Sequence, residues 1–153
     1  MKKISNLRRI QNEVKDIVND SSTNCIQIKM ISDNIYKYIA EISGPIDSLY
    51  EGYKFKLSID LSDDYPFSPP SIKFLTPIKH LNINSTGNIC LDLLKDNWKP
   101  LLSIKSILMS IILLLSEPNI SDPLDSDLAV IYRTNKKEYA TIIKKYCENN
   151  REK

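Results

Sequence analysis

The stretch Tyr53-Lys54-Phe55-Lys56-Leu57-Ser58-Ile59-Asp60-Leu61 alternates apolar and polar side chains without a break. A period of two predicts a β-strand with one buried face and one solvent-facing face. Weaker strand patterns occupy residues 25–30, 36–42 and 71–74. The connections between these stretches are short and rich in turn residues, and no helical pattern interrupts them. We therefore predict a four-stranded antiparallel meander.

A helical pattern precedes the strands, over residues 3–19. Its predicted inner face consists of Leu7, Ile10, Val14, Ile17 and Val18.

Three further helices are predicted after the strands. The first is strongly apolar and has Ser103 as its N-cap. The second opens with Asp122 as N-cap and Pro123 at the first helical position. The last is capped by Asn135 together with Glu138. One helix, four strands, a long irregular segment and three helices make an α+β fold, and 153 residues fit one domain spanning 1–153.

Composition excludes several classes of protein. The net charge of +2 argues against a strongly basic nucleic-acid binder. One histidine and the absence of any CxxC pair exclude a multi-histidine metal site and a zinc ribbon. Three glycines allow no nucleotide-binding phosphate loop. We see neither a signal peptide nor a membrane span, and expect a cytoplasmic protein that can also be nuclear.

The irregular segment, residues 76–100, holds the only histidine, the only tryptophan and Cys90. A loop cysteine can be an exposed nucleophile, but free cysteines are also among the most buried residues. His80 lies ten residues before Cys90. From chemistry alone, therefore, a cysteine hydrolase that uses His80 as its base stays open.

The stretch from His80 to Asp92, with His80-Leu81-Asn82 ahead of Cys90, resembles the active-site segment of ubiquitin-conjugating enzymes, where a His-Pro-Asn tripeptide precedes the catalytic cysteine. Three further stretches resemble the same family in the same order. They are Tyr65-Pro66-Phe67-Ser68-Pro69-Pro70, Trp98-Lys99-Pro100-Leu101, and Glu117-Pro118-Asn119 through Asp122-Pro123-Leu124. The resemblance covers essentially the whole chain and is greatest to the minimal, broad-specificity members.

The resemblance implies a mechanism. Cys90 would carry ubiquitin as a thioester received from an activating enzyme, and would pass it to a lysine amine or to a ligase cysteine. Asn82 would stabilise the oxyanion, and Asp122 would orient the lysine. His80, Asp92 and Asn119 would be structural residues of the active site. No metal or bound cofactor is implied, because ATP is used by the activating enzyme.

Simpler structural roles stay open for two of these residues. Asn82 could form an Asx-turn in the loop. Asp122 could merely cap the third helix.

The resemblance also implies partner surfaces. Arg8 and Arg9 would contact the activating enzyme and ligases. Two loops would dock RING or HECT ligases through four residues: Pro66, Phe67, Pro100 and Leu101. Phe67 could alternatively be a core aromatic. The implied partners are therefore ubiquitin, its activating enzyme, ligases and protein substrates, without nucleic acid or membrane.

Three positions depart from the family pattern. Leu81 replaces a proline, so we expect a less rigid loop. Leu101 replaces a small residue, which would narrow the choice of ligase. Ile26 replaces a serine that broad-specificity members use to bind ubiquitin on the back of the sheet. A non-catalytic member that only binds ubiquitin or a ligase is a further alternative, and the presence of Cys90, Asn82 and Asp122 together speaks against it.

Overall fold

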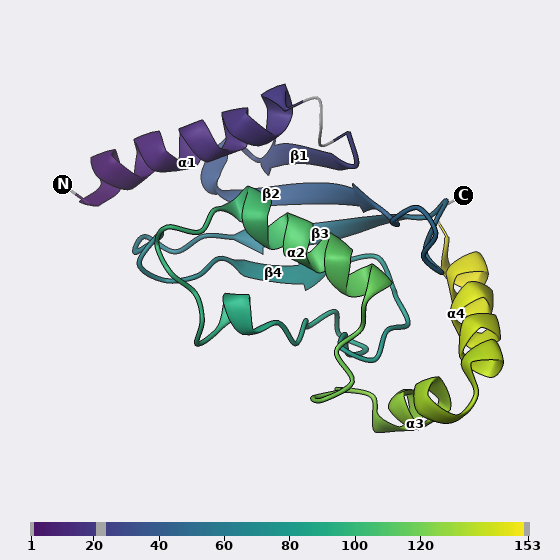
Figure 1. Cartoon of the computed structure of the whole chain (residues 1–153). Coiled ribbons are helices and arrows are strands. Elements are labelled where there is room, and N and C mark those ends of the chain that lie inside the picture. Colours follow the sequence, from purple (N-terminus) through teal and green to yellow (C-terminus); the bar gives the residue numbers. More distant parts are fainter. Residues whose placement is uncertain (1, 21–23, 152–153) are drawn as a thin grey trace.

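The computed structural model describes residues 2–20 and 24–151 (Figure 1). Its elements confirm the predicted α+β order. They are α1 (Lys2–Asn19), β1 (Ile26–Ile31), β2 (Asn34–Ser43), β3 (Lys54–Asp60), β4 (Ser71–Phe74), the short 3₁₀ helix η2 (Asp92–Leu94), α2 (Ile104–Ser116), α3 (Ser126–Thr134) and α4 (Lys136–Asn150).

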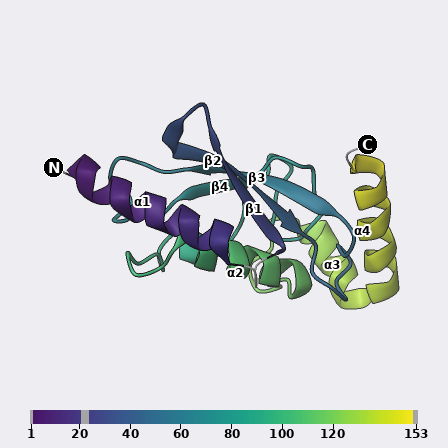
Figure 2. The same ribbon diagram turned by 90° about the horizontal axis from the view of Figure 1, so that it is seen from above.

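The sheet is an antiparallel meander with strand order β1-β2-β3-β4. On β3 the inward side chains Phe55, Leu57 and Ile59 are 2%, 0% and 0% exposed, as the alternation predicts. Helix α2 lies across this face of the sheet, and α1 lies on the same side (Figures 1 and 2). The core therefore lies between one face of the sheet and these two helices, where it holds α2 residues such as Ile104, Ile107 and Ile111.

The three C-terminal helices confirm most of the predicted capping. Ser103 caps α2 and forms a reciprocal pair of hydrogen bonds with Ser106. Asn135 caps α4 by accepting a hydrogen bond from the Glu138 main-chain N–H. Helices α3 and α4 pack against each other at one end of the sheet (Figure 1). The rings of Tyr132 and Tyr139 meet edge to face there, with their centroids 4.8 Å apart.

Some predictions about the helix faces are wrong. Val18 is 64% exposed, because it lies on the outer side of α1. In its place α1 buries two polar side chains, Asn6 and Glu13, which hydrophobic periodicity could not identify.

Ile26, the first residue of β1, is only 5% exposed and belongs to the core, so it does not lie on the open face of the sheet.

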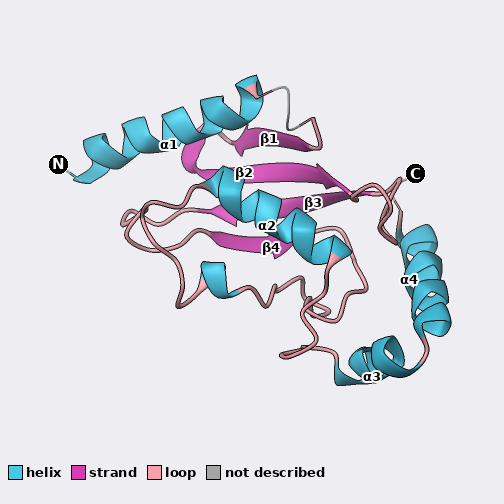
Figure 3. Ribbon diagram, in the orientation of Figure 1, coloured by secondary structure: helices cyan, strands magenta, loops and turns pink. Residues whose placement is uncertain are grey.

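A long irregular segment joins β4 to α2, with η2 as its one helical turn (Figure 3). It runs along the edge of β4, where the main-chain N–H of Phe74 donates to the carbonyl of Gly87 at 2.9 Å. Gly87 has φ of +87°, and a Cβ there would lie 2.1 Å from the Phe74 carbonyl oxygen. Only glycine fits this close approach.

None of the helices that the structure describes is long and apolar enough to cross a membrane.

Candidate active site

Cys90 lies in the irregular segment and is half-buried. Its main-chain N–H donates to the Asn82 carbonyl at 2.8 Å, which ties the cysteine to the preceding loop. Its thiol faces the Asp122 carboxylate, with Sγ 3.5 Å from Oδ2. The structure therefore brings together residues separated by 32 positions.

An open hollow of about 400 Å³ surrounds this thiol. Eight residues line it: Cys90, Leu91, Asp92, Lys95, Asp96, Leu114, Asn119 and Asp122. Burial and then the hydrogen bond and charge of Asp122 raise the pKa of the Cys90 thiol, whereas Lys95 opposes the rise. The resting cysteine is therefore held as a thiol near neutral pH.

Asn82 is fully buried, with 0% exposure. Its amide Nδ2 donates to the Asn119 carbonyl at 2.7 Å, and its Oδ1 accepts from the Asn119 main-chain N–H at 2.8 Å. The side chain therefore braces the segment that carries Asp122. This bracing is a structural role, but it differs from the local Asx-turn that sequence considerations left open.

The prediction that Asp122 caps the third helix is wrong. Helix α3 begins at Ser126, and its N-cap is Asp125, whose carboxylate accepts from the Leu128 N–H at 3.0 Å. The main-chain N–H groups of Leu124 and Asp125 donate to the Leu81 carbonyl, so the segment ahead of α3 follows the active-site loop instead of starting a helix. Asp122 is thus left exposed beside Cys90.

Leu81 occupies the position where the family pattern has proline. Its side chain is 0% exposed and belongs to the core. Its carbonyl accepts hydrogen bonds from Leu124 at 2.7 Å and Asp125 at 3.2 Å. These contacts anchor the residue without the fixed φ of proline, so a loose loop is no longer expected here.

His80 is buried, with 1% exposure, and both ring nitrogens are engaged. Nδ1 accepts from the Asn82 main-chain N–H at 2.9 Å, and Nε2 lies 2.8 Å from the Leu114 carbonyl, to which it donates. Burial lowers the pKa of His80 to about 4. A neutral imidazole with no free nitrogen cannot take a proton from Cys90, which removes the cysteine-hydrolase alternative.

The state of His80 can be measured directly, because the chain has one histidine. We expect imidazole nitrogen NMR shifts of a neutral Nε2–H tautomer down to about pH 4.

The low pKa of His80 also makes the stability of the protein depend on pH. The pKa of His80 in the folded protein lies below its value in the unfolded chain, so the unfolded chain binds the proton first and stability falls as the pH drops from about 6.5 to 4. The loss attributable to His80 should reach about 3 kcal/mol at pH 4. Urea unfolding of wild type and His80→Gln at pH 7 and pH 4 checks this. The wild type should lose more stability than the variant between the two pH values, and equal losses would contradict the buried neutral state.

Asp122 should slow the alkylation of the Cys90 thiol, because its charge raises the pKa of that thiol. Asp122→Asn removes the negative charge that raises the Cys90 pKa, so Cys90 should be alkylated faster by iodoacetamide at pH 8. Mass mapping of Cys90 separates this reaction from any at the other cysteines. Asp92→Asn is the matched control, since the charge of Asp92 raises the Cys90 pKa less than that of Asp122 does and its removal should accelerate alkylation less. An unchanged or slower reaction of Asp122→Asn would contradict the inference that the carboxylate raises the pKa of Cys90.

Asp92 and Asn119 both line the hollow. Asp92 opens η2 and accepts from the Asn97 side-chain amide at 2.7 Å. Asn119 accepts from the N–H and the hydroxyl of Ser121 through its Oδ1, and binds Asn82 through its main chain. Both make the local hydrogen bonds expected of structural residues, while their roles in the reaction stay predictions.

The two predicted docking loops lie side by side. Phe67 is 71% exposed and Leu101 is 95% exposed, so the alternative of a core aromatic at Phe67 is wrong. Trp98 joins the loops by donating from Nε1 to the Pro66 carbonyl at 2.8 Å. Pro100 is exposed as well. Two unpartnered apolar side chains on adjacent loops make a surface suited to a protein partner.

The two arginines of α1 differ. Arg8 is exposed. Arg9 is turned toward the protein: Nε donates to Glu13, and Nη2 donates to the carbonyls of Pro100 and Leu102, all at 2.7 Å. Sequence reasoning missed Glu13, since a polar residue on a helix gives no sign of burial.

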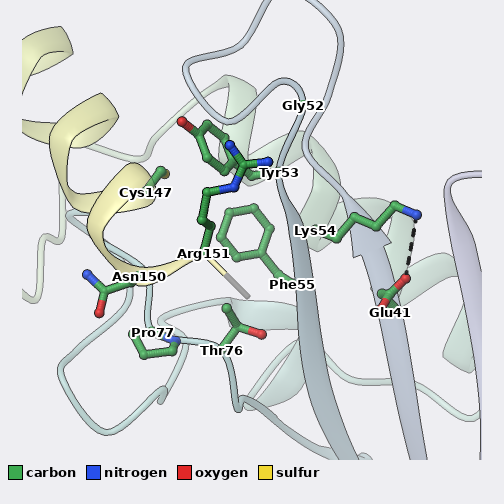
Figure 4. Close-up of a pocket in the computed structure, with 10 residues that line it drawn as sticks. All are labelled: Glu41, Gly52, Tyr53, Lys54, Phe55, Thr76, Pro77, Cys147, Asn150 and Arg151. Carbon is green, nitrogen blue, oxygen red and sulfur yellow. Dashed lines mark ion pairs between the residues drawn. The ribbon is translucent and has the colours of Figure 1, made fainter. Parts of the chain in front are cut away.

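A separate cavity of about 310 Å³ lies between the end of α4 and β3 (Figure 4). Its charged lining residues are paired: Lys54 with Glu41 at 3.9 Å, and Arg151 with Glu148 at 3.4 Å. The Arg151 guanidinium also lies over the Tyr53 ring. Of these contacts, only that between Arg151 and Tyr53 joins the end of the C-terminal helix to the segment ahead of β3. Within residues 2–20 and 24–151, no group of three or more potential metal ligands comes together.

Comparison with known proteins agrees with this arrangement. A sequence model described as ubiquitin-conjugating enzyme matches residues 9–147. The chain is 49% identical over 149 residues to a protein of Acanthamoeba polyphaga mimivirus named as a probable ubiquitin-conjugating enzyme E2, with 95% of this chain and 94% of the relative covered. Since the family match runs from within α1 to within α4, the chain belongs to the ubiquitin-conjugating enzyme family and is a ubiquitin-transferring enzyme.

Proposed function

We propose that Cys90 is the residue that carries ubiquitin. The observation that supports it is the thiol lining an open hollow, 3.5 Å from Asp122 and tied to the Asn82 loop. The Cys90 thiol gives up its proton to water, and the resulting thiolate attacks the thioester carbonyl carbon of ubiquitin bound to the activating enzyme. A new C–S bond forms, and the thiolate of the activating enzyme leaves. ATP is consumed by the activating enzyme and not by this protein.

Discharge follows one of two routes. With a RING ligase, a neutral lysine amine attacks the thioester carbonyl, and the developing oxyanion is stabilised by hydrogen-bond donors that include the Asn82 amide. The Cys90 thiolate leaves and the amine proton passes to Asp122 or to water. With a HECT ligase, a cysteine of the ligase attacks instead.

The main role of Asp122 is to position the attacking lysine, and accepting the proton of that lysine is its second role. A carboxylate beside an ammonium favours the charged form, so it raises the lysine pKa and does not itself deprotonate the amine. Holding the amine close to the carbonyl, and accepting its proton as the bond forms, is consistent with an exposed Asp122 that lines the hollow and faces the thiol.

The direct test is a charging assay with ubiquitin, its activating enzyme and ATP, read on non-reducing and reducing gels. We expect a shift by the mass of one ubiquitin that reductant removes. If ubiquitin gives no shift while SUMO or NEDD8 with its own activating enzyme does, the proposal that the protein carries ubiquitin is wrong. If none of the three charges the protein, the carrier role is wrong.

A further inference from the structure

Helix α1 contains a buried carboxylate that the proposed chemistry does not use. Glu13 is 9% exposed. Its Oε2 accepts from Arg9 Nε and from the Tyr65 hydroxyl, both at 2.7 Å, and its Oε1 accepts from the main-chain N–H of Ile104 at 2.7 Å. A buried charge is costly unless it is paired and hydrogen-bonded, and here both oxygens have partners.

One partner of Glu13 anchors the loop that carries Phe67. Tyr65 is 1% exposed and lies two residues before Phe67. Its ring packs against Trp98 with centroids 5.9 Å apart, and Trp98 in turn donates to the Pro66 carbonyl. The Tyr65 hydroxyl thus fastens this loop to α1 through Glu13, beside a second hydrogen bond from the Asn6 side-chain amide to the Asp63 carbonyl at 2.8 Å.

The other partners anchor the loop that carries Leu101. Arg9, fixed by Glu13, donates to the carbonyls on either side of Leu101, those of Pro100 and Leu102. Ile104, the first residue of α2, donates directly to Glu13. The carboxylate therefore supplies an anion to the N-terminus of α2 as well, where it is stabilising. One carboxylate holds both loops to the same helix.

We propose that Glu13 is a positioning residue for ligase docking, which sets the separation of Phe67 and Leu101 by fastening both loops to α1. It acts through Tyr65, Arg9 and Ile104 and does not itself contact the partner. This inference rests on the proposed function, since it takes the partner of the two exposed side chains to be the RING domain of a ligase.

The first test needs no ligase. Trp98 is the only tryptophan, so intrinsic fluorescence reports on the junction of the two loops. Glu13→Gln keeps the shape of the side chain but cannot accept from all three donors. We expect a red-shifted emission and stronger acrylamide quenching than in the wild type, with unchanged helix content by circular dichroism. Tyr65→Phe, which removes only the hydroxyl, should shift both readings in the same direction and stays informative if Glu13→Gln fails to fold.

The second test measures docking. The probe is an isolated RING domain that accelerates discharge of ubiquitin from the wild-type enzyme to free lysine. For Glu13→Gln, the RING concentration needed for half-maximal acceleration should rise about tenfold, which corresponds to 1.4 kcal/mol. The rate at saturating RING should change far less, because the residue positions the docking surface and does not touch the reacting atoms. Asp16→Asn is the matched control, since it removes the same charge from an exposed position of α1 and should change neither reading.

The outcomes separate the two proposals. Unchanged Trp98 fluorescence in both Glu13→Gln and Tyr65→Phe would overturn the positioning role. The role would also be overturned if Glu13→Gln altered the fluorescence but left the half-maximal RING concentration unchanged. An equal effect of Asp16→Asn would assign the loss to helix charge instead of to Glu13. A wild-type enzyme that fails to charge or that no RING domain accelerates contradicts the proposed function itself, and this is seen before any variant is made.

Discussion

Replacing Cys90 by alanine should abolish charging with ubiquitin completely. Replacing it by serine should leave at most a slowly formed ester that survives reductant. Alanine has no nucleophile, and a hydroxyl is far less nucleophilic than a thiol near neutral pH. The hollow around residue 90 holds one cysteine, so no neighbouring thiol in its lining can substitute. The measurement is the charging assay on paired reducing and non-reducing gels.

The chain offers a matched control for this prediction. Cys25 is half-buried like Cys90, but it lies just before β1 and outside the hollow. Cys25→Ser should charge at the wild-type level and release ubiquitin on reduction. Charging that persists in Cys90→Ala, or that disappears in Cys25→Ser, would place the thioester on a different residue.

Replacing Asn82 by alanine should slow transfer of ubiquitin to lysine by about 10²–10³-fold, the usual cost of one oxyanion donor. Charging should be reduced far less, if the amide acts chiefly when the lysine attacks. The measurement is single-turnover discharge of purified charged enzyme to free lysine, followed separately from the charging rate.

The brace between Asn82 and Asn119 complicates this result, because the variant also loses two hydrogen bonds to the segment that carries Asp122. Asn119→Ala separates the two effects. Asn119 meets Asn82 through its main chain, so the substitution keeps the brace and removes only the contacts to Ser121. We expect a loss well below that of Asn82→Ala. If Asn82→Ala slowed lysine transfer only a few-fold, the oxyanion role would be wrong here.

Much of the fold was predictable, because it depends on local periodicity. The alternation over residues 53–61 determined the inward face of β3, and the apolar stripe after Ser103 determined the buried face of α2. Ser103 and Asn135 cap their helices as expected because a cap requires only residues three positions apart. The motif around Cys90 identified the family for the same reason, since its residues are close in sequence.

Tertiary structure decided the features that depend on distant partners. Asp122 and Asp125 are equivalent as caps by composition, and the hydrogen bonds of the following segment to the Leu81 carbonyl decide that Asp125 caps α3. Nothing in the sequence around Glu13 indicates burial, yet its carboxylate is buried because it accepts hydrogen bonds from Tyr65 and Ile104.

The sequence by itself determined the α+β order and the strand faces, and it identified Cys90 as the candidate catalytic cysteine. Only the tertiary structure decided that His80 is neutral and unavailable, that Asp122 faces the thiol, and that Glu13 joins the two docking loops. The physical reason is that hydrophobic periodicity and capping act over a few residues, whereas the protonation and burial of a polar group depend on whichever distant donors and acceptors the fold brings to it.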